Sequence, residues 1–96
     1  MYALIGRVRI KPSHEEETAA MAREHGPGLV GSLSGKAAYW ARAVEQSGDL
    51  VQHSFWLFET EDEARAAEAT FNSLREMPEA PAEFISAEVC EVIAAV

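Results

Sequence analysis

The stretch Leu50-Val51-Gln52-His53-Ser54-Phe55-Trp56-Leu57-Phe58-Glu59, followed directly by Thr60-Glu61-Asp62-Glu63, carries the strongest structural signal of the chain. Side chains of a strand point alternately to its two faces, and large apolar residues stand here in both sets. Both faces of the strand should therefore be covered, as they are inside a sheet. Thr60 supplies an N-cap hydroxyl and Glu63 completes a capping box, so a helix should begin at once.

The two faces of this strand predict two different partners. One face carries Val51, His53, Phe55 and Leu57, and the other carries Gln52, Ser54, Trp56 and Phe58. In a chain of 96 residues, we expect one face to take the chain's own helices and the other to take a second copy of the chain. We assign Phe55 and Leu57 to the helices. Trp56 and Phe58 then face the second copy, because two large aromatics in water would form an unusual apolar patch.

Composition argues against several classes of protein. The chain is 48% hydrophobic and 25% charged, which is ordinary for a soluble protein, and its length predicts one domain over residues 1–96. The net charge of −8 argues against nucleic acid and anionic membrane surfaces, since both need clustered Lys and Arg. No apolar run approaches the roughly 20 residues of a membrane span. The single cysteine, Cys90, and the lack of a signal-peptide pattern predict a cytoplasmic protein.

Three further strands and two helices are predicted around the central strand. The strands span Tyr2–Ile10, roughly Lys36–Glu45, and Phe84–Ile93. The first helix runs from about His14 to His25, with a capping box at Ser13 and a stop at Gly26-Pro27-Gly28, and a loop follows over Leu29–Gly35. The second helix spans about Glu61–Met77, with an inward stripe of Ala64, Ala67, Phe71 and Leu74.

The order β-α-β-β-α-β predicts a ferredoxin-like fold. Right-handed crossovers and a central hairpin give an antiparallel sheet with both helices on one face. A two-residue turn at Ser47-Gly48 would place Trp40 opposite Phe55 and Arg42 opposite His53, although a longer turn would shift this register. We expect a second copy to cover the other face, which makes the assembly a homodimeric α+β barrel.

This element order, the Gly26-Pro27-Gly28 break and the passage from Phe55 through Thr60 to Ala64 resemble the antibiotic biosynthesis monooxygenase-like superfamily of dimeric α+β barrels. The resemblance implies a homodimer with a ligand cleft between the sheet and helices of each subunit. It further implies cofactor-independent oxygenation of a small aromatic compound, as in the polyketide oxygenases of that superfamily. A haem-degrading role transfers badly, because Gly6 and Ala67 stand where such enzymes carry Asn and Trp.

The residues then suggest a catalytic base and four substrate contacts. A half-buried His53 near Arg42 could take a proton from a phenol, or could simply be a satisfied core histidine. The predicted substrate contacts are Trp40, Arg42, Phe55 and Phe71. Trp40 could equally belong to the core, and Arg42 could pair with a glutamate. Non-catalytic binding of a small molecule, and a cyclase or isomerase that uses His53, are the alternative functions.

Other polar residues are interpreted as structural. Arg7 and Arg9 alternate on the expected dimer face and predict ion pairs between the two copies. Cys90 is expected to be a small buried residue. His14, His25 and His53 lack the spacing of a metal motif, so neither a metal nor a cofactor is predicted.

Overall fold

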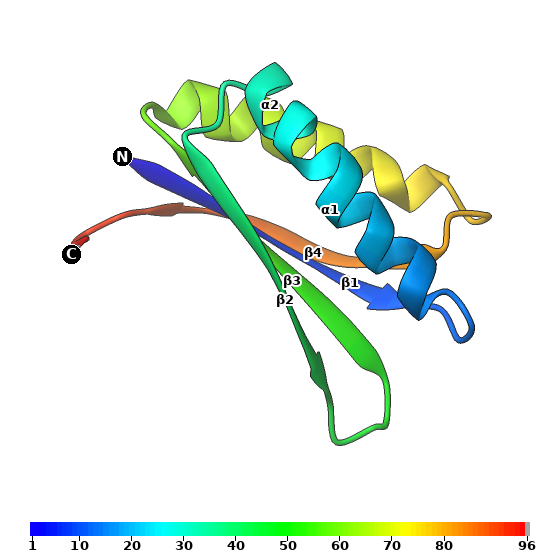
Figure 1. The fold of residues 1–96 in the computed structure, drawn as a ribbon. Coiled ribbons are helices and arrows are strands. Elements are labelled where there is room, and N and C mark those ends of the chain that lie inside the picture. Colours follow the sequence, from blue (N-terminus) through cyan, green and yellow to red (C-terminus); the bar gives the residue numbers. More distant parts are fainter. Residues whose placement is uncertain (96) are drawn as a thin grey trace.

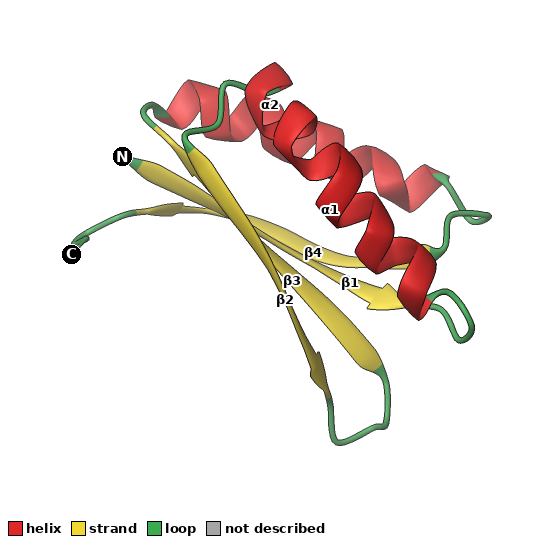
Figure 2. Ribbon diagram, viewed as in Figure 1, coloured by secondary structure: helices red, strands yellow, loops and turns green. Residues whose placement is uncertain are grey.

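The computed structural model describes residues 1–95, with every side chain among them except that of Leu74. Its elements are β1 (Tyr2–Ile10), α1 (Glu15–Ser32), β2 (Ala37–Val44), β3 (Leu50–Phe58), α2 (Glu61–Asn72), the 3-10 turn η1 (Ser73–Glu76) and β4 (Ala82–Glu91). The four strands form one antiparallel sheet in the order β2-β3-β1-β4. Both helices cover the same face of this sheet (Figures 1 and 2). The predicted β-α-β-β-α-β ferredoxin-like fold is confirmed.

The helix-covered face holds the core, and it is the face that we had assigned to a second copy. Trp56 and Phe58 are 1% and 0% exposed within the single chain, so their predicted place at a dimer interface is wrong. Leu4 lies opposite Trp56 on β1, and Ala64 and Ala67 of α2 complete the buried cluster. Because the alanine side chains are small, α2 can lie close to the sheet and still leave space for the rings of Trp56 and Phe58.

The β2–β3 hairpin explains a second correction. Its connection contains three residues, because Glu45 N–H donates to the Asp49 carbonyl at 2.9 Å and Gly48 N–H donates to the Glu45 carbonyl at 2.9 Å. Gly48 has a φ of 91°, which suits glycine at the last position of such a loop. One extra residue shifts the register by one. Trp40 therefore lies opposite Ser54, and Arg42 opposite Gln52, instead of opposite Phe55 and His53.

Helix α1 is longer than the sequence predicted. It continues through Gly26-Pro27-Gly28 to Ser32, so the predicted stop is wrong and most of the predicted loop is helical. Gly26 is buried against the ring of Trp40, where a Cβ would come within 2.6 Å of Cη2. This contact needs a glycine within the helix, so here the glycine serves packing instead of ending the helix.

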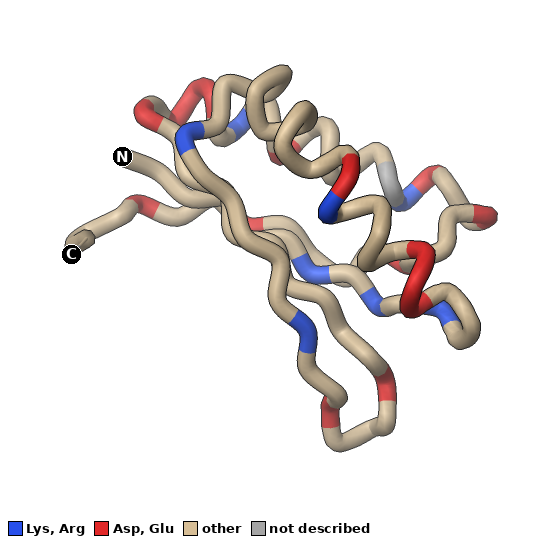
Figure 3. The backbone as a smooth tube through the Cα atoms, viewed as in Figure 1, with Lys and Arg blue, Asp and Glu red and all other residues tan. Residues whose placement is uncertain are grey.

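The two predicted capping boxes have different outcomes. Glu63 N–H donates to the Thr60 hydroxyl oxygen at 3.2 Å, which confirms the cap of α2. At α1 the N-cap residue is His14, without a side-chain cap, and Ser13 precedes it with a φ of 72°. The expected box at Ser13 is therefore wrong. Acidic residues still gather in the first turns of both helices (Figure 3), where the helix dipole favours them.

Within residues 1–95, no helix lies on the second face of the sheet (Figure 2). On it, the rings of Tyr39 and Phe55 meet edge to face at 6.4 Å and are 69% and 37% exposed. Because β3 presents Phe55 and His53 to this side, the prediction that they face the helices is also wrong. We refer to the β-sheet surface around Tyr39, His53 and Phe55 as the open face.

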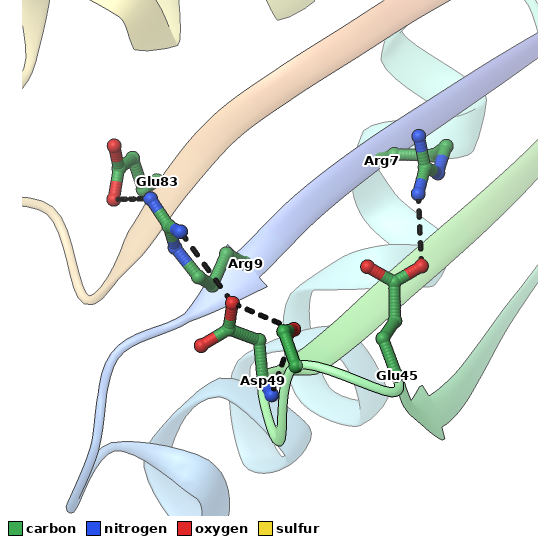
Figure 4. Close-up of polar contacts among 6 residues, drawn as sticks. Arg7, Arg9, Glu45, Asp49 and Glu83 are labelled. Atoms are coloured by element: carbon green, nitrogen blue, oxygen red, sulfur yellow. Dashed lines mark hydrogen bonds and ion pairs between the residues drawn. The ribbon is translucent and has the colours of Figure 1, made fainter.

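Arginines of β1 form ion pairs at one end of the open face. Arg7 lies 3.1 Å from Glu45, while Arg9 lies 2.5 Å from Glu83 and 3.6 Å from Asp49 (Figure 4). The hydrogen bond and charge of Glu83 raise the pKa of Arg9 above its usual value. Arg7 and Arg9 thus have partners within the chain, and the expected pairing between two copies stays a prediction.

Candidate functional site

A groove of about 540 Å³ lies between α1 and the β2–β3 hairpin. Its lining consists of Glu16, Ala19, Ala22, Arg23, Pro27, Trp40, Arg42 and Gln52. The volume lies within the range of small-molecule sites. The lining is half apolar, with the aromatic ring of Trp40 as one wall, and half polar. We call this space the α1 groove.

Much of the α1 groove lies along α1 between two buried positions of the helix. Thr18 and Gly26 are the buried residues of α1, and eight positions along a helix span about 12 Å. Between them, Ala19 and Ala22 have methyl side chains that are too short to fill the gap to β2. Small side chains between two close contacts therefore leave a hollow under the helix.

Arg42 fixes one end of the α1 groove. Its guanidinium donates to the Gln52 side chain at 2.9 Å, to the carbonyl of Glu15 at 2.8 Å and to the hydroxyl of Thr18 at 2.5 Å. The Thr18 hydroxyl in turn lies 2.8 Å from the His14 carbonyl, so it links the guanidinium to the first turn of α1. These three bonds tie α1 to β2 and hold the Arg42 charge in one position.

Trp40 forms the other wall and is the outermost of three rings that meet edge to face. Its centroid lies 5.4 Å from that of Trp56, which lies 5.3 Å from that of Phe71, and both pairs are nearly perpendicular. Phe71 sits directly over Gly6, where a Cβ would come within 2.7 Å of Cε1. Phe71 thus fills the space between α2 and the sheet and supports the Trp40 wall from behind.

One buried donor within these rings has no partner. The indole N–H of Trp56 makes no hydrogen bond with any described protein atom, although Trp56 is 1% exposed. Leaving a buried donor unpaired costs about 1–3 kcal/mol. The Trp56 ring meets Trp40 and Phe71 edge to face, and such aromatic pairs contribute about 0.5–1.5 kcal/mol each.

The five predicted site residues do not meet in one place. Trp40 and Arg42 line the α1 groove together, and Phe71 lies behind it. His53 and Phe55 lie on the open face, on the other side of the sheet. The one-residue difference in register causes this separation, because it reverses the faces of β3 relative to those of β2.

Sequence reasoning missed three polar residues of the groove. Gln52 follows from the correct hairpin register, since it is the partner of Arg42. Glu16 and Arg23 are seven positions apart on α1 and therefore share a side of the helix. Both residues lie within the helix predicted from His14 to His25, so the helical spacing alone could have grouped them.

The histidines and the cysteine lie apart from the α1 groove. His14 is 2.6 Å from Glu17 at the start of α1, and Cys90, expected to be buried, is half-exposed on β4. Among residues 1–95, no group of three His, Cys, Asp or Glu side chains is placed to hold a metal ion. No helix in this part of the chain is both long and apolar enough to cross a membrane.

Comparison with known proteins supports the fold. No family model matches the sequence, and no curated protein matches it. Among solved structures, the chain is similar to a dimeric ferredoxin-like protein from an uncultured marine organism. The two share 10% sequence identity with a TM-score of 0.69, over 99% of this chain and 97% of the other. This similarity places the chain in the ferredoxin-like fold class.

Proposed function

We propose that this chain is a single-domain subunit of a homodimeric α+β barrel that binds a small aromatic compound in the α1 groove. One observation carries the proposal. Trp40 presents an aromatic wall to a hollow of about 540 Å³ that also contains the fixed guanidinium of Arg42. A planar compound can stack on such a wall while a polar substituent bonds to the guanidinium. Membership of the antibiotic biosynthesis monooxygenase-like superfamily is part of this proposal.

The open face supports the dimer. Tyr39 and Phe55 form an exposed aromatic pair on a sheet face that no helix covers. Burial of a large side chain contributes roughly 1.5–3 kcal/mol, and a second copy would offer the same apolar surface in return. The solved relative described above is itself named as dimeric, which agrees with this arrangement.

Cofactor-independent oxygenation is the activity proposed for the bound compound. Conversion of a ring CH2 to a ketone consumes one dioxygen and releases one water, so an electron-rich substrate such as an anthrone supplies every electron. His53 is the candidate base of this reaction only for a compound held between the two sheets, because it lies on the open face. Arg42 and Gln52 would stabilise a phenolate in the α1 groove.

Binding is tested by NMR titration with 1-naphthol. We expect the amide signals of α1 and β2 to shift, and we expect Trp40→Leu to weaken binding about fivefold, because a ring stacked on an indole gains of the order of 1 kcal/mol. Phe55→Leu on the open face is the matched control and should bind normally. Shifts confined to the open face, or equal binding by both variants, would place the ligand elsewhere.

Oxygenation is tested with an anthrone-type compound under oxygen. Oxygen uptake above the rate without protein would support a monooxygenase, and binding without uptake would support the non-catalytic alternative. A comparison with His53→Ala then assigns the base. Loss of uptake in this variant would favour a reaction between the two sheets, whereas unchanged uptake would favour the α1 groove.

A further inference from the structure

The basic residues of this chain divide into two sets of equal size. The sequence contains 8 Lys and Arg against 16 Asp and Glu, so acidic partners are in excess. Arg7, Arg9, Lys36 and Arg65 each form an ion pair with a carboxylate. Within the described part of the chain, Lys11, Arg23, Arg42 and Arg75 form none.

All four cations of the second set line hollows of the surface. Arg23 and Arg42 line the α1 groove. Lys11 and Arg75 line a hollow of about 480 Å³ beside Phe84. In that second hollow both cations have another contact, since Lys11 donates to the Pro78 carbonyl at 2.6 Å and Arg75 lies 4.3 Å above the Phe84 ring. In the α1 groove, by contrast, Arg23 makes no side-chain hydrogen bond with the described residues, so this groove offers the better anion site.

Arg42 and Arg23 differ in how firmly they are held. Arg42 uses one N–H of each guanidinium nitrogen within the protein, so two of its five donors remain. Arg23 is exposed on α1 and makes no side-chain hydrogen bond with the described residues. A fixed cation on the sheet and a free one on the helix thus line the same groove, and a ligand anion bound there could accept from both.

Charge within the α1 groove agrees with an anionic ligand. Glu16 is the only carboxylate of its lining, against two guanidinium groups. Glu16 is exposed at the start of α1, where the helix dipole and water also stabilise its charge. A neutral ligand would leave the excess positive charge of the groove without an anionic partner.

We infer that the α1 groove selects an anionic planar aromatic compound, an aromatic carboxylate, whose ring stacks on Trp40 and whose carboxylate binds between Arg23 and Arg42. This inference rests on the proposed aromatic binding function and adds the charge of the ligand. Bidentate binding of a carboxylate by a guanidinium is stronger and more directional than binding of a neutral group.

The test compares 2-naphthoate with its neutral amide, 2-naphthamide, by isothermal titration calorimetry. The two compounds have the same ring, and carboxylic acids of this kind are ionised at pH 7. We expect the full chain to bind 2-naphthoate at least about tenfold more tightly than 2-naphthamide, because a charge-assisted hydrogen bond contributes about this much affinity. Added salt should weaken the binding of 2-naphthoate alone.

Arg23→Gln is the informative variant, because Arg42 also anchors α1 and its loss could disturb folding. Arg23→Gln should lower the affinity for 2-naphthoate about tenfold and leave that for 2-naphthamide unchanged. Arg65→Gln removes an arginine that is ion-paired on α2 and outside the groove, and should change neither.

Each result decides between the proposals. Equal affinity for the two compounds would overturn the anionic selectivity and leave aromatic binding in place. No effect of Arg23→Gln would overturn the carboxylate position between Arg23 and Arg42. Failure of the wild-type chain to bind either compound would overturn the proposed function and this inference together. Preference for 2-naphthoate that only Arg23→Gln reduces would support both.

Discussion

The indole ring of Trp40 lies against the backbone of Gly26, so closely that a Cβ at Gly26 would approach Cη2 within 2.6 Å. This contact joins the middle of α1 to the edge strand β2. It sets the height of the helix above the sheet, and with it the depth of the α1 groove. The absence of a Cβ at Gly26 therefore sets the position of the Trp40 ring, on which the proposed ligand stacks.

We predict that Gly26→Ala destabilises the protein by about 1–3 kcal/mol, as overpacking of a core does. The new methyl group meets the Trp40 ring, and a Cβ before Pro27 also disfavours the helical backbone. Gly28→Ala is the control, because nothing lies within 4 Å of its Cβ. It should stabilise α1 by roughly 0.5–1 kcal/mol. Urea denaturation measures both, and a stable Gly26→Ala would contradict the contact.

We predict a similar but separable effect at Gly6. Its Cβ would lie 2.7 Å from Cε1 of Phe71 and 2.9 Å from Oγ of Ser54, so Gly6→Ala should cost about 1–3 kcal/mol. Phe71→Leu removes the ring from above Gly6. In that background the cost of Gly6→Ala should fall by at least about 0.5 kcal/mol. Additive effects in a double-mutant cycle would show that the two residues do not compete for this space.

Local signals predicted the elements of this fold well. The strand Tyr2–Ile10 was predicted at its observed bounds, and the second helix was predicted to begin at Glu61, where it does. Alternation of side chains and the Thr60 capping box are properties of a few neighbouring residues, which is why they can be seen without a structure. The candidate site depends instead on relations between elements.

Two such relations could not be seen in the sequence. The faces of β3 depend on whether its hairpin loop has two or three residues, and the dipeptide Ser47-Gly48 fits both. The helix through Pro27 depends on the fit between Gly26 and a ring fourteen residues further along the chain. Because a one-residue shift reverses every side chain of a strand, the observed loop places His53 and Trp40 on opposite faces, whereas the predicted turn placed them on the same face.

We predict that the two helix starts respond differently to loss of a hydroxyl. Thr60→Ala removes the acceptor of the Glu63 N–H and should cost about 1 kcal/mol. Ser13→Ala should cost less, because α1 has no side-chain cap at its N-cap residue. Thermal unfolding of the two variants under the same conditions measures the difference. A larger loss of stability for Ser13→Ala than for Thr60→Ala would instead support the capping box predicted at Ser13.

We predict that the open face carries the dimer contact. The wild-type chain should sediment with the mass of two chains, and Phe55→Glu should sediment as one, because a carboxylate would be buried among apolar side chains without a partner. Its circular dichroism should stay unchanged, since Phe55 is 37% exposed within the single chain. Leu29→Glu is the matched control. Leu29 is 42% exposed on α1, on the opposite side of the sheet, so this variant should remain a dimer. A wild-type monomer, or a dimer that survives Phe55→Glu but not Leu29→Glu, would contradict the proposed barrel.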